Sequence, residues 1–121
     1  MVISSQMNQL KRARQLLKAI SDDTRLRIVN LLSEQELNVS GICDILKKNQ
    51  SVVSKHLARL RHAGVVSDRR EGMHVFYFLI KSRTDPIQNA VLPIAKKGLQ
   101  NLEIFREDLK QMKRKMRRIK R

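Results

Sequence analysis

The stretch at residues 50–66, QSVVSKHLARLRHAGVV, constrains the fold most, because it separates into two unlike faces when it is wound as a helix. At about 100° per residue, aliphatic side chains gather on one face, which predicts that this face packs into a core. The aliphatic side chains are Val53, Leu57 and Leu60. The opposite face consists of Ser51, Ser54, Lys55 and Ala58. Its short hydroxyl groups and long cation suit contact with water and an anionic partner.

A second short helical pattern precedes this one. Its apolar side chains recur at i, i+3, i+4 and i+7, and they are Val39, Ile42, Cys43 and Leu46. Asn38 and Asn49 each stand directly before one of the two helices, where an N-cap residue is expected. Gly64 follows the later helix, where a left-handed residue commonly ends a helix. Two short helices joined by a tight turn predict a helix-turn-helix at residues 39–63.

After Gly64 the sequence changes to β-branched and aromatic side chains. Two such runs, VVSDRR and MHVFYFLI, are separated by Glu71 and Gly72, which is typical of a β-hairpin. This pattern predicts a two-stranded wing at residues 65–80. Because aromatic residues make up only 3% of the chain, packed helices are favoured over a large sheet. The expected fold is mostly α with a small β-hairpin, a winged helix-turn-helix.

Two helices are expected before this unit. Residues 5–20 repeat apolar side chains at steps of three and four, and these are Met7, Leu10, Ala13, Leu17 and Ile20. Asp22 or Asp23 can then cap a second helix, which contains TRLRIVNLL. The apolar face of this helix is too wide for a surface position, so it is expected at the centre of the fold.

A long last helix is expected at residues 85–112. Asp85 and Pro86 supply an N-cap and a first-turn proline, while Pro93 can kink or restart the helix. A basic tail, residues 113–121, follows. It can be solvated charge, a contact with flanking DNA, or a continuation of the helix.

The apolar stripes of the first and last helices exceed what a single winged helix can cover. A homodimer through residues 5–20 and 85–112 is therefore expected. The predicted interface residues are Leu10, Leu17, Leu99, Leu102 and Leu109.

Charge and composition narrow the class of protein. The chain has 121 residues, which is the size of one domain, so residues 1–121 are expected to form a single unit. Its 26 Lys and Arg outnumber its 11 Asp and Glu, for a net charge of +15, so a polyanion is the natural partner. One cysteine cannot form an internal disulfide, and no apolar run reaches the length of a membrane span. These features favour a cytoplasmic protein without a membrane partner.

Residues 17–79 resemble the ArsR/SmtB family of winged-helix transcriptional repressors. The resemblance rests on LKAISDDTRLRIVNLL, then ELNVSGICDIL, then QSVVSKHLARLRHAGVVSDRREGMHVFYFL. It implies a dimer with the first and last helices at its interface. It also implies a partly palindromic operator that is released when an effector binds, although the sequence does not identify an effector.

The chain departs from the metal-sensing members of that family. Asn38 and Ser40 stand where those members carry cysteines, and neither is a soft-metal ligand. The last helix has no His or Cys, so its acidic residues are interpreted as a charged helix surface. These acidic residues are Glu103, Glu107 and Asp108. No metal and no other cofactor is expected.

Within the helix-turn-helix, the N-terminal half of the second helix is expected to enter the major groove of DNA. The predicted base contacts are Gln50, Ser51, Val52, Ser54 and Lys55. The predicted backbone and wing contacts are Lys47, Lys48, Arg59, Arg61, His62, Arg69, Arg70 and His74. Lys47 and Lys48 replace the usual glycine and apolar residue of the resembled family, and they are either phosphate contacts or solvated turn residues.

Two further side chains of this unit receive structural interpretations. His56 lies near the core face of its helix, where a hydrogen bond from the ring to the backbone is expected. Cys43 lies on the apolar stripe of its helix, so a buried structural thiol is favoured over a redox switch.

The sequence therefore predicts a sequence-specific DNA-binding regulator, most simply a repressor with half-sites roughly 34 Å apart. The alternative is a non-specific, nucleoid-like DNA-binding protein, which the high charge and the basic C-terminal run favour. An enzyme is not expected, because the chain lacks a phosphate-binding glycine loop and paired Cys or His clusters.

Overall fold

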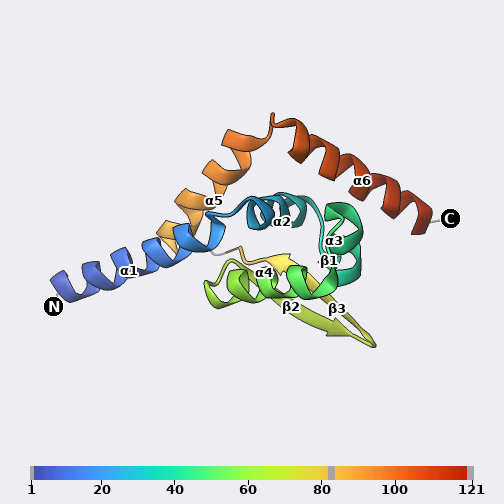
Figure 1. Ribbon diagram of the computed structural model, residues 1–121. Helices are drawn as coiled ribbons and strands as arrows, with labels where there is room; N and C mark the ends of the chain where they lie inside the picture. Colours follow the sequence, from blue (N-terminus) through green and yellow to red (C-terminus); the bar gives the residue numbers. More distant parts are fainter. Residues whose placement is uncertain (1, 82–83, 120–121) are drawn as a thin grey trace.

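The computed structural model describes residues 2–81 and 84–119, and the chain folds as a helical body with a small sheet at one edge (Figure 1). The elements are α1 (Val2–Ile20), α2 (Asp23–Glu34), β1 (Leu37–Asn38), α3 (Val39–Leu46), α4 (Gln50–His62), β2 (Val66–Glu71), β3 (His74–Leu79), α5 (Pro86–Leu99) and α6 (Glu103–Ile119). Figure 1 shows α1 extending away from the body, with α5 and α6 above α2 and with α4 and the hairpin below it. The mostly helical winged fold is confirmed.

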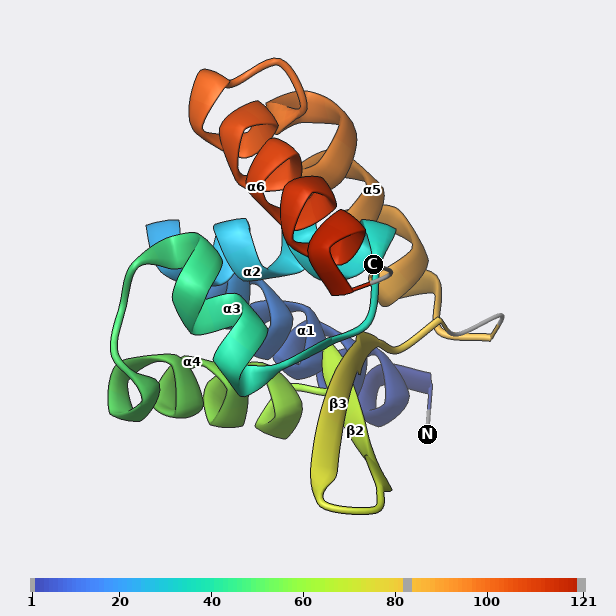
Figure 2. The same ribbon diagram turned by 90° about the vertical axis from the view of Figure 1, so that its right-hand side faces the viewer.

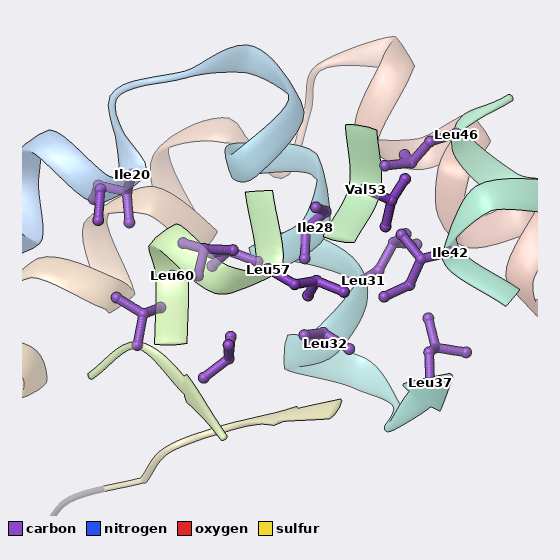
Figure 3. Close-up of a cluster of buried hydrophobic side chains, with 14 of the residues drawn as sticks. Ile20, Ile28, Leu31, Leu32, Leu37, Ile42, Leu46, Val53, Leu57 and Leu60 are labelled. Atoms are coloured by element: carbon purple, nitrogen blue, oxygen red, sulfur yellow. The ribbon is translucent and has the colours of Figure 1, made fainter. Parts of the chain in front are cut away.

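A continuous aliphatic core joins α2, α3 and α4 (Figure 3). The predicted core face of α4 is confirmed, since Val53, Leu57 and Leu60 are at most 1% exposed. They meet Ile28 of α2 and Ile42 of α3, both fully buried. Burial of each such side chain stabilises the fold by about 1.5–3 kcal/mol relative to exposure. The core therefore fixes which face of α4 remains on the surface.

Side-chain caps begin the helices of this core where the sequence predicts them. Asp22, rather than Asp23, caps α2 by accepting from the amide of Arg25 at 3.0 Å. The side-chain oxygens of Asn38 and Asn49 accept hydrogen bonds from the backbone amides of Gly41 and Val52, at 2.8 Å and 2.9 Å. These two caps begin α3 and α4. Each such cap is worth about 1 kcal/mol.

The wing is a three-stranded antiparallel sheet rather than a hairpin alone. Its strand order is β1-β3-β2, in which Leu37 of β1 and Asp68 of β2 both pair with Tyr77. The hairpin itself is confirmed, with Gly72 in its turn at a φ of 60°. The two-residue strand β1 is too short to show an alternating pattern, so the sequence did not reveal it.

The prediction of a single last helix at residues 85–112 is wrong. The chain forms two helices, α5 and α6, which are separated at residues 100–102, and Pro93 lies inside α5. The break allows α6 to fold back, so that Phe105 and Met112 are only 4% and 3% exposed. Figures 1 and 2 show α6 passing over α2 and toward α3. The residues expected as a tail continue this helix to Ile119, while residues 120–121 lie outside the described part.

The predicted dimer residues lie in different surroundings. Leu10, Leu17 and Leu102 are 59%, 50% and 48% exposed, whereas Leu99 is half-buried. Leu109 packs against the core of its own chain. Within the described residues, none of the helices combines the length and the apolar character that crossing a bilayer requires.

Candidate nucleic-acid interface

The α4 helix and the hairpin lie together at one edge of the molecule, below α3 in Figure 2. Because the aliphatic face of α4 is buried, its polar face is left on the surface. Four of the five predicted base contacts are exposed, and Val52 is half-buried. The exposed four are Gln50, Ser51, Ser54 and Lys55. The arrangement presents a row of hydroxyl, amide and ammonium groups at the N-terminal end of a rigid helix.

The turn before α4 places two lysines beside this row. Lys47 is exposed and ends α3 in the left-handed conformation, with a φ of 56° and a ψ of 46°. This conformation costs a non-glycine residue roughly 1–2 kcal/mol. The amide of the half-buried Lys48 donates to the carbonyl of Cys43 at 3.2 Å, which closes the end of α3.

The C-terminal half of α4 adds further cations. Arg59, Arg61 and His62 are exposed, and Arg61 Nη2 lies 3.5 Å from the Asp68 carboxylate of β2. A hollow of about 390 Å³ lies between the exposed side of α4 and Tyr77 of the sheet. Its lining consists of Ser54, Ala58, Arg61, His62 and Tyr77. The helix and the wing therefore form two sides of one open, basic surface.

The wing arginines have unlike surroundings. Arg69 forms an ion pair with Glu36, and its Nη2 lies 3.3 Å from a carboxylate oxygen of Glu71. Its guanidinium also stacks on Phe76, with the guanidinium carbon 5.3 Å from the centre of the ring. Arg70 is exposed, and the ion pairs found among the described residues do not include it. His74 is also exposed. The wing thus presents one neutralised and one available guanidinium.

The backbone hydrogen bond expected for His56 is wrong. Its Nδ1 lies 3.1 Å from Nη1 of Arg25 and 3.7 Å from the Asp22 carboxylate. Burial lowers the pKa of His56, and the Asp22 carboxylate only partly opposes this. Because a guanidinium can only donate, Nδ1 of the ring is the acceptor in the contact with Arg25. Arg25 in turn donates through Nε to the carbonyl of Ala19. His56 thereby ties the middle of α4 to the junction of α1 and α2.

A second network, which the sequence did not reveal, holds the C-terminal end of α4. Arg12 of α1 donates through Nη1 to the carbonyl of Ala63 at 3.0 Å and through Nη2 to Asp85 at 2.8 Å. Gln88 is only 2% exposed and donates to the carbonyls of Gly64 and Ile80 at 3.2 Å and 2.8 Å. Asp85, the predicted cap of α5, has its pKa lowered mainly by the hydrogen bond from Arg12. Nothing in the local pattern distinguishes Arg12 or Gln88 from a solvated helix residue.

The acidic residues of α6 do not form the uniform surface that the sequence predicts. Glu103 and Glu107 are exposed, but Asp108 is 3% exposed and accepts two hydrogen bonds from Arg27 of α2. The expectation that Asp108 lies on the helix surface is wrong, because α6 packs that side against α2.

Two of the side chains considered for metal binding have other partners. The Asn38 oxygen is used as the α3 cap, and Asp108 is held by Arg27. In the part of the chain that the structure describes, no three His, Cys, Asp or Glu side chains come together closely enough to hold a metal ion. Cys43 is half-buried, and burial, followed by the neighbouring Asp44, raises the pKa of its thiol. A raised pKa is typical of an unreactive thiol.

Comparisons with known proteins agree with this geometry. Residues 22–68 match the family described as bacterial regulatory protein, arsR family. The chain is 40% identical over 82 residues to an uncharacterized HTH-type transcriptional regulator of Methanocaldococcus jannaschii, MJ1325, covering 67% of this chain and 92% of that protein.

Solved structures extend the likeness. The transcriptional repressor BigR from Xylella fastidiosa superposes with a TM-score of 0.63 at 28% identity, covering 81% of this chain and 95% of that one. A homodimeric winged helix-turn-helix DNA-binding domain, Mb0332 from Mycobacterium bovis, gives a TM-score of 0.54 at 30% identity, covering 63% and 68%. The chain belongs to the ArsR family of bacterial regulatory proteins, as a winged helix-turn-helix transcriptional regulator.

Proposed function

We propose that this chain is a sequence-specific repressor that binds a partly palindromic operator as a homodimer in the cytoplasm, without catalytic activity. The observation that carries the proposal is the exposed polar face of α4, which the buried Val53, Leu57 and Leu60 hold in place. The major groove is wide enough for one helix and displays a different pattern for each base pair. Ser51, Ser54 and the other exposed groups at the start of α4 are proposed to read it.

The surrounding cations are proposed to position α4 on the phosphates. Lys47 and Lys48 precede the helix, Arg59 and Arg61 lie in its C-terminal half, and Arg70 extends from the wing. Contacts of this kind supply affinity and register but do not read sequence. They also make binding weaken steeply as salt rises.

Dimerisation is proposed to occur through α1. Its exposed apolar side chains form a stripe on a helix that extends from the body in Figure 1. They are Ile3, Met7, Leu10 and Leu17, each at least 50% exposed. The homodimeric state of Mb0332 supports a homodimer, and the exposed stripe is the reason for proposing α1 as its interface. A twofold dimer would place two α4 helices in half-sites about 34 Å apart.

The decisive experiment uses a duplex that the wild-type protein selects from a random pool. The triple variant Ser51→Ala, Ser54→Ala and Lys55→Ala is expected to lose at least about a hundredfold in affinity for that duplex, because each good base contact discriminates by about 1–3 kcal/mol. Lys110→Ala, at an exposed position of α6 before the basic tail, removes one positive charge outside the proposed DNA contacts and serves as the control. Unchanged selection by a folded triple variant would refute the proposal.

A nucleoid-like coating protein is the second candidate, and the net charge of +15 favours it. The two functions differ in the ratio of specific to random-duplex affinity at physiological salt. A regulator should exceed about a thousandfold, whereas a coating protein should show nearly equal affinities.

A further inference from the structure

A pocket with a volume of about 400 Å³ opens between α2, the end of β3 and α5. Val29 of α2, Leu79 of β3 and Leu92 of α5 line it. It lies at the end of β3 that is remote from the wing turn at Gly72. The proposed DNA contacts include none of these side chains. Its size falls within the range of small-molecule sites, which is roughly 300–1,000 Å³.

The pocket combines apolar walls with a cationic rim. The walls include Val29, Leu79, Ile80, Leu92 and Pro93. The rim carries three exposed lysines, Lys81, Lys96 and Lys97. Among the described residues that line the pocket, none is an Asp or a Glu. These walls and this rim complement a molecule that has an apolar body and an anionic group.

The three ammonium groups are not equally engaged. Lys96 Nζ lies 3.5 Å from a carboxylate oxygen of Glu34, which stands outside the pocket lining. The ion pairs formed within residues 2–81 and 84–119 include neither Lys81 nor Lys97. Two cations at the rim are therefore left for an incoming carboxylate.

A second copy of this chain is a poor occupant of the pocket. Both copies carry a net charge of +15, and covering the rim would remove Lys81, Lys96 and Lys97 from water beside another basic surface. Burial of unpaired charge costs several kcal/mol per group. A small organic anion instead brings the opposite charge and its own apolar surface.

We propose that this pocket binds an organic anion of the medium-chain carboxylate class. Its hydrocarbon body packs against Val29 and Leu92, and its carboxylate lies among Lys81, Lys96 and Lys97. Binding requires no DNA and no metal.

Gln88 links the pocket to the end of α4. It lines the pocket, and its amide group donates to the carbonyls of Ile80 and Gly64 at 2.8 Å and 3.2 Å. Gly64 follows α4 in the left-handed conformation, with a φ of 76°. A ligand that displaces Gln88 changes how the end of α4 is held, so occupancy should alter operator affinity. This link, unlike the binding itself, rests on the proposed DNA-binding function.

Calorimetric titration of the free protein tests the site with decanoate, kept below its micelle concentration. Decanoate is expected to bind one molecule per chain, while acetate and decylammonium bind at least about tenfold more weakly, because they lack the apolar body or the negative charge. Equal binding of acetate would reduce the effect to general charge attraction. If decylammonium bound as tightly as decanoate, the lysines would not contribute to binding. Equal binding of acetate or of decylammonium overturns the proposal.

Three variants with exposed side chains make the test specific. Lys97→Gln should weaken decanoate binding about two- to fivefold, and Glu34→Gln should strengthen it by a similar factor, because it releases Lys96. Lys113→Gln, on α6 outside the pocket lining, makes the same change in net charge as Lys97→Gln and should have no effect. An equal loss in the two lysine variants would refute the site.

Two further measurements separate the alternatives. Decanoate and the selected duplex should change each other's affinity by the same factor, since coupling between sites is reciprocal. Binding of decanoate without any change in duplex affinity would refute the link through Gln88. A loss of decanoate binding as the protein dimerises would show that a second copy covers the pocket, and this result overturns the proposal. If the protein fails to bind DNA, the titration of the free protein with decanoate still tests the pocket.

Discussion

Arg27 and Asp108 stand 81 residues apart and form a two-pronged ion pair, with Nε and Nη2 each 2.8 Å from a carboxylate oxygen. The Asp108 side chain is 4% exposed and the Arg27 side chain 18% exposed. The hydrogen bonds with Asp108 raise the pKa of the Arg27 guanidinium, although burial opposes this. Beside this pair, Asn30 donates to the carbonyl of Phe105 at 3.2 Å. The pair therefore fastens α6 to the central helix.

Removing one member of this pair should destabilise the protein markedly. Asp108→Ala leaves a largely buried guanidinium without its carboxylate, and breaking a buried pair in this way costs about 3–5 kcal/mol. We expect the free energy of unfolding in urea to fall by that order. Glu107→Ala is the matched control, because Glu107 is exposed, and its effect should stay within about 0.5 kcal/mol. Similar losses in both variants would contradict a special role for Asp108.

Two substitutions at Lys47, which lies in a strained turn, can distinguish its effect on stability from a contact with DNA. Lys47→Gly should stabilise the fold by about 0.5–1 kcal/mol, because glycine adopts the left-handed conformation without strain but is more flexible when unfolded. Lys47→Ala removes the same charge but keeps the strain. If Lys47 contacts a phosphate, both variants should reduce the slope of log K against log salt by about 0.9. Unchanged slopes would show that Lys47 is a solvated turn residue.

His56 should make stability depend on pH. Burial lowers its pKa in the folded protein below the ordinary value of 6.5, so the unfolded chain binds the proton more readily. Stability is therefore complete above the unfolded pKa, and it is lost as pH falls from about 7 toward the folded pKa. His56→Gln should flatten this part of the urea midpoint profile, and His62→Gln, on the exposed side of α4, should not. A rise in the stability of the wild type on acidification would have the wrong sign.

The ion pair with Glu36 should compete with DNA for the Arg69 guanidinium. Glu36→Gln removes one of the two carboxylates beside Arg69 and one negative charge near the proposed DNA surface. We expect affinity for the selected duplex to rise a few-fold at low salt, with a smaller gain at high salt. Glu107→Gln, on α6, is the control for net charge. Weaker binding by Glu36→Gln would indicate instead that the pair orders the wing for DNA contact.

The exposed stripe of α1 should control assembly. Leu10→Glu with Leu17→Glu places two charges where a second copy is proposed to pack, and it should yield monomers in analytical ultracentrifugation. Lys18→Glu, an exposed neighbour on the same helix, should leave the assembly unchanged. Because a monomer has one α4 helix, the double variant should also lose most of its affinity for the selected duplex. If the double variant remained a dimer, the interface would not be formed by this stripe of α1.

Local patterns were sufficient for much of the DNA-binding unit. The caps Asn38 and Asn49 act on amides three residues away, and the buried face of α4 follows from its 3.6-residue period. The hairpin follows from two strand-forming runs around Gly72. Features of this kind depend on residues that are close together in the sequence, so the local sequence pattern is enough to predict them.

Contacts between distant segments required the tertiary structure. A 3.6-residue period cannot show whether a helix stripe meets another chain or folds back, so α6 packing on α2 through Asp108 was not foreseen. The same holds for Arg12 and Gln88, which reach carbonyls at the end of α4, and for His56, whose partner is a guanidinium rather than backbone. The sequence by itself determined the two helices of the helix-turn-helix, their caps Asn38 and Asn49, and the face of α4 that stays on the surface. Only the tertiary structure decided which charged groups are buried, because the burial of a charge depends on which distant partner the packed chain brings within hydrogen-bond distance.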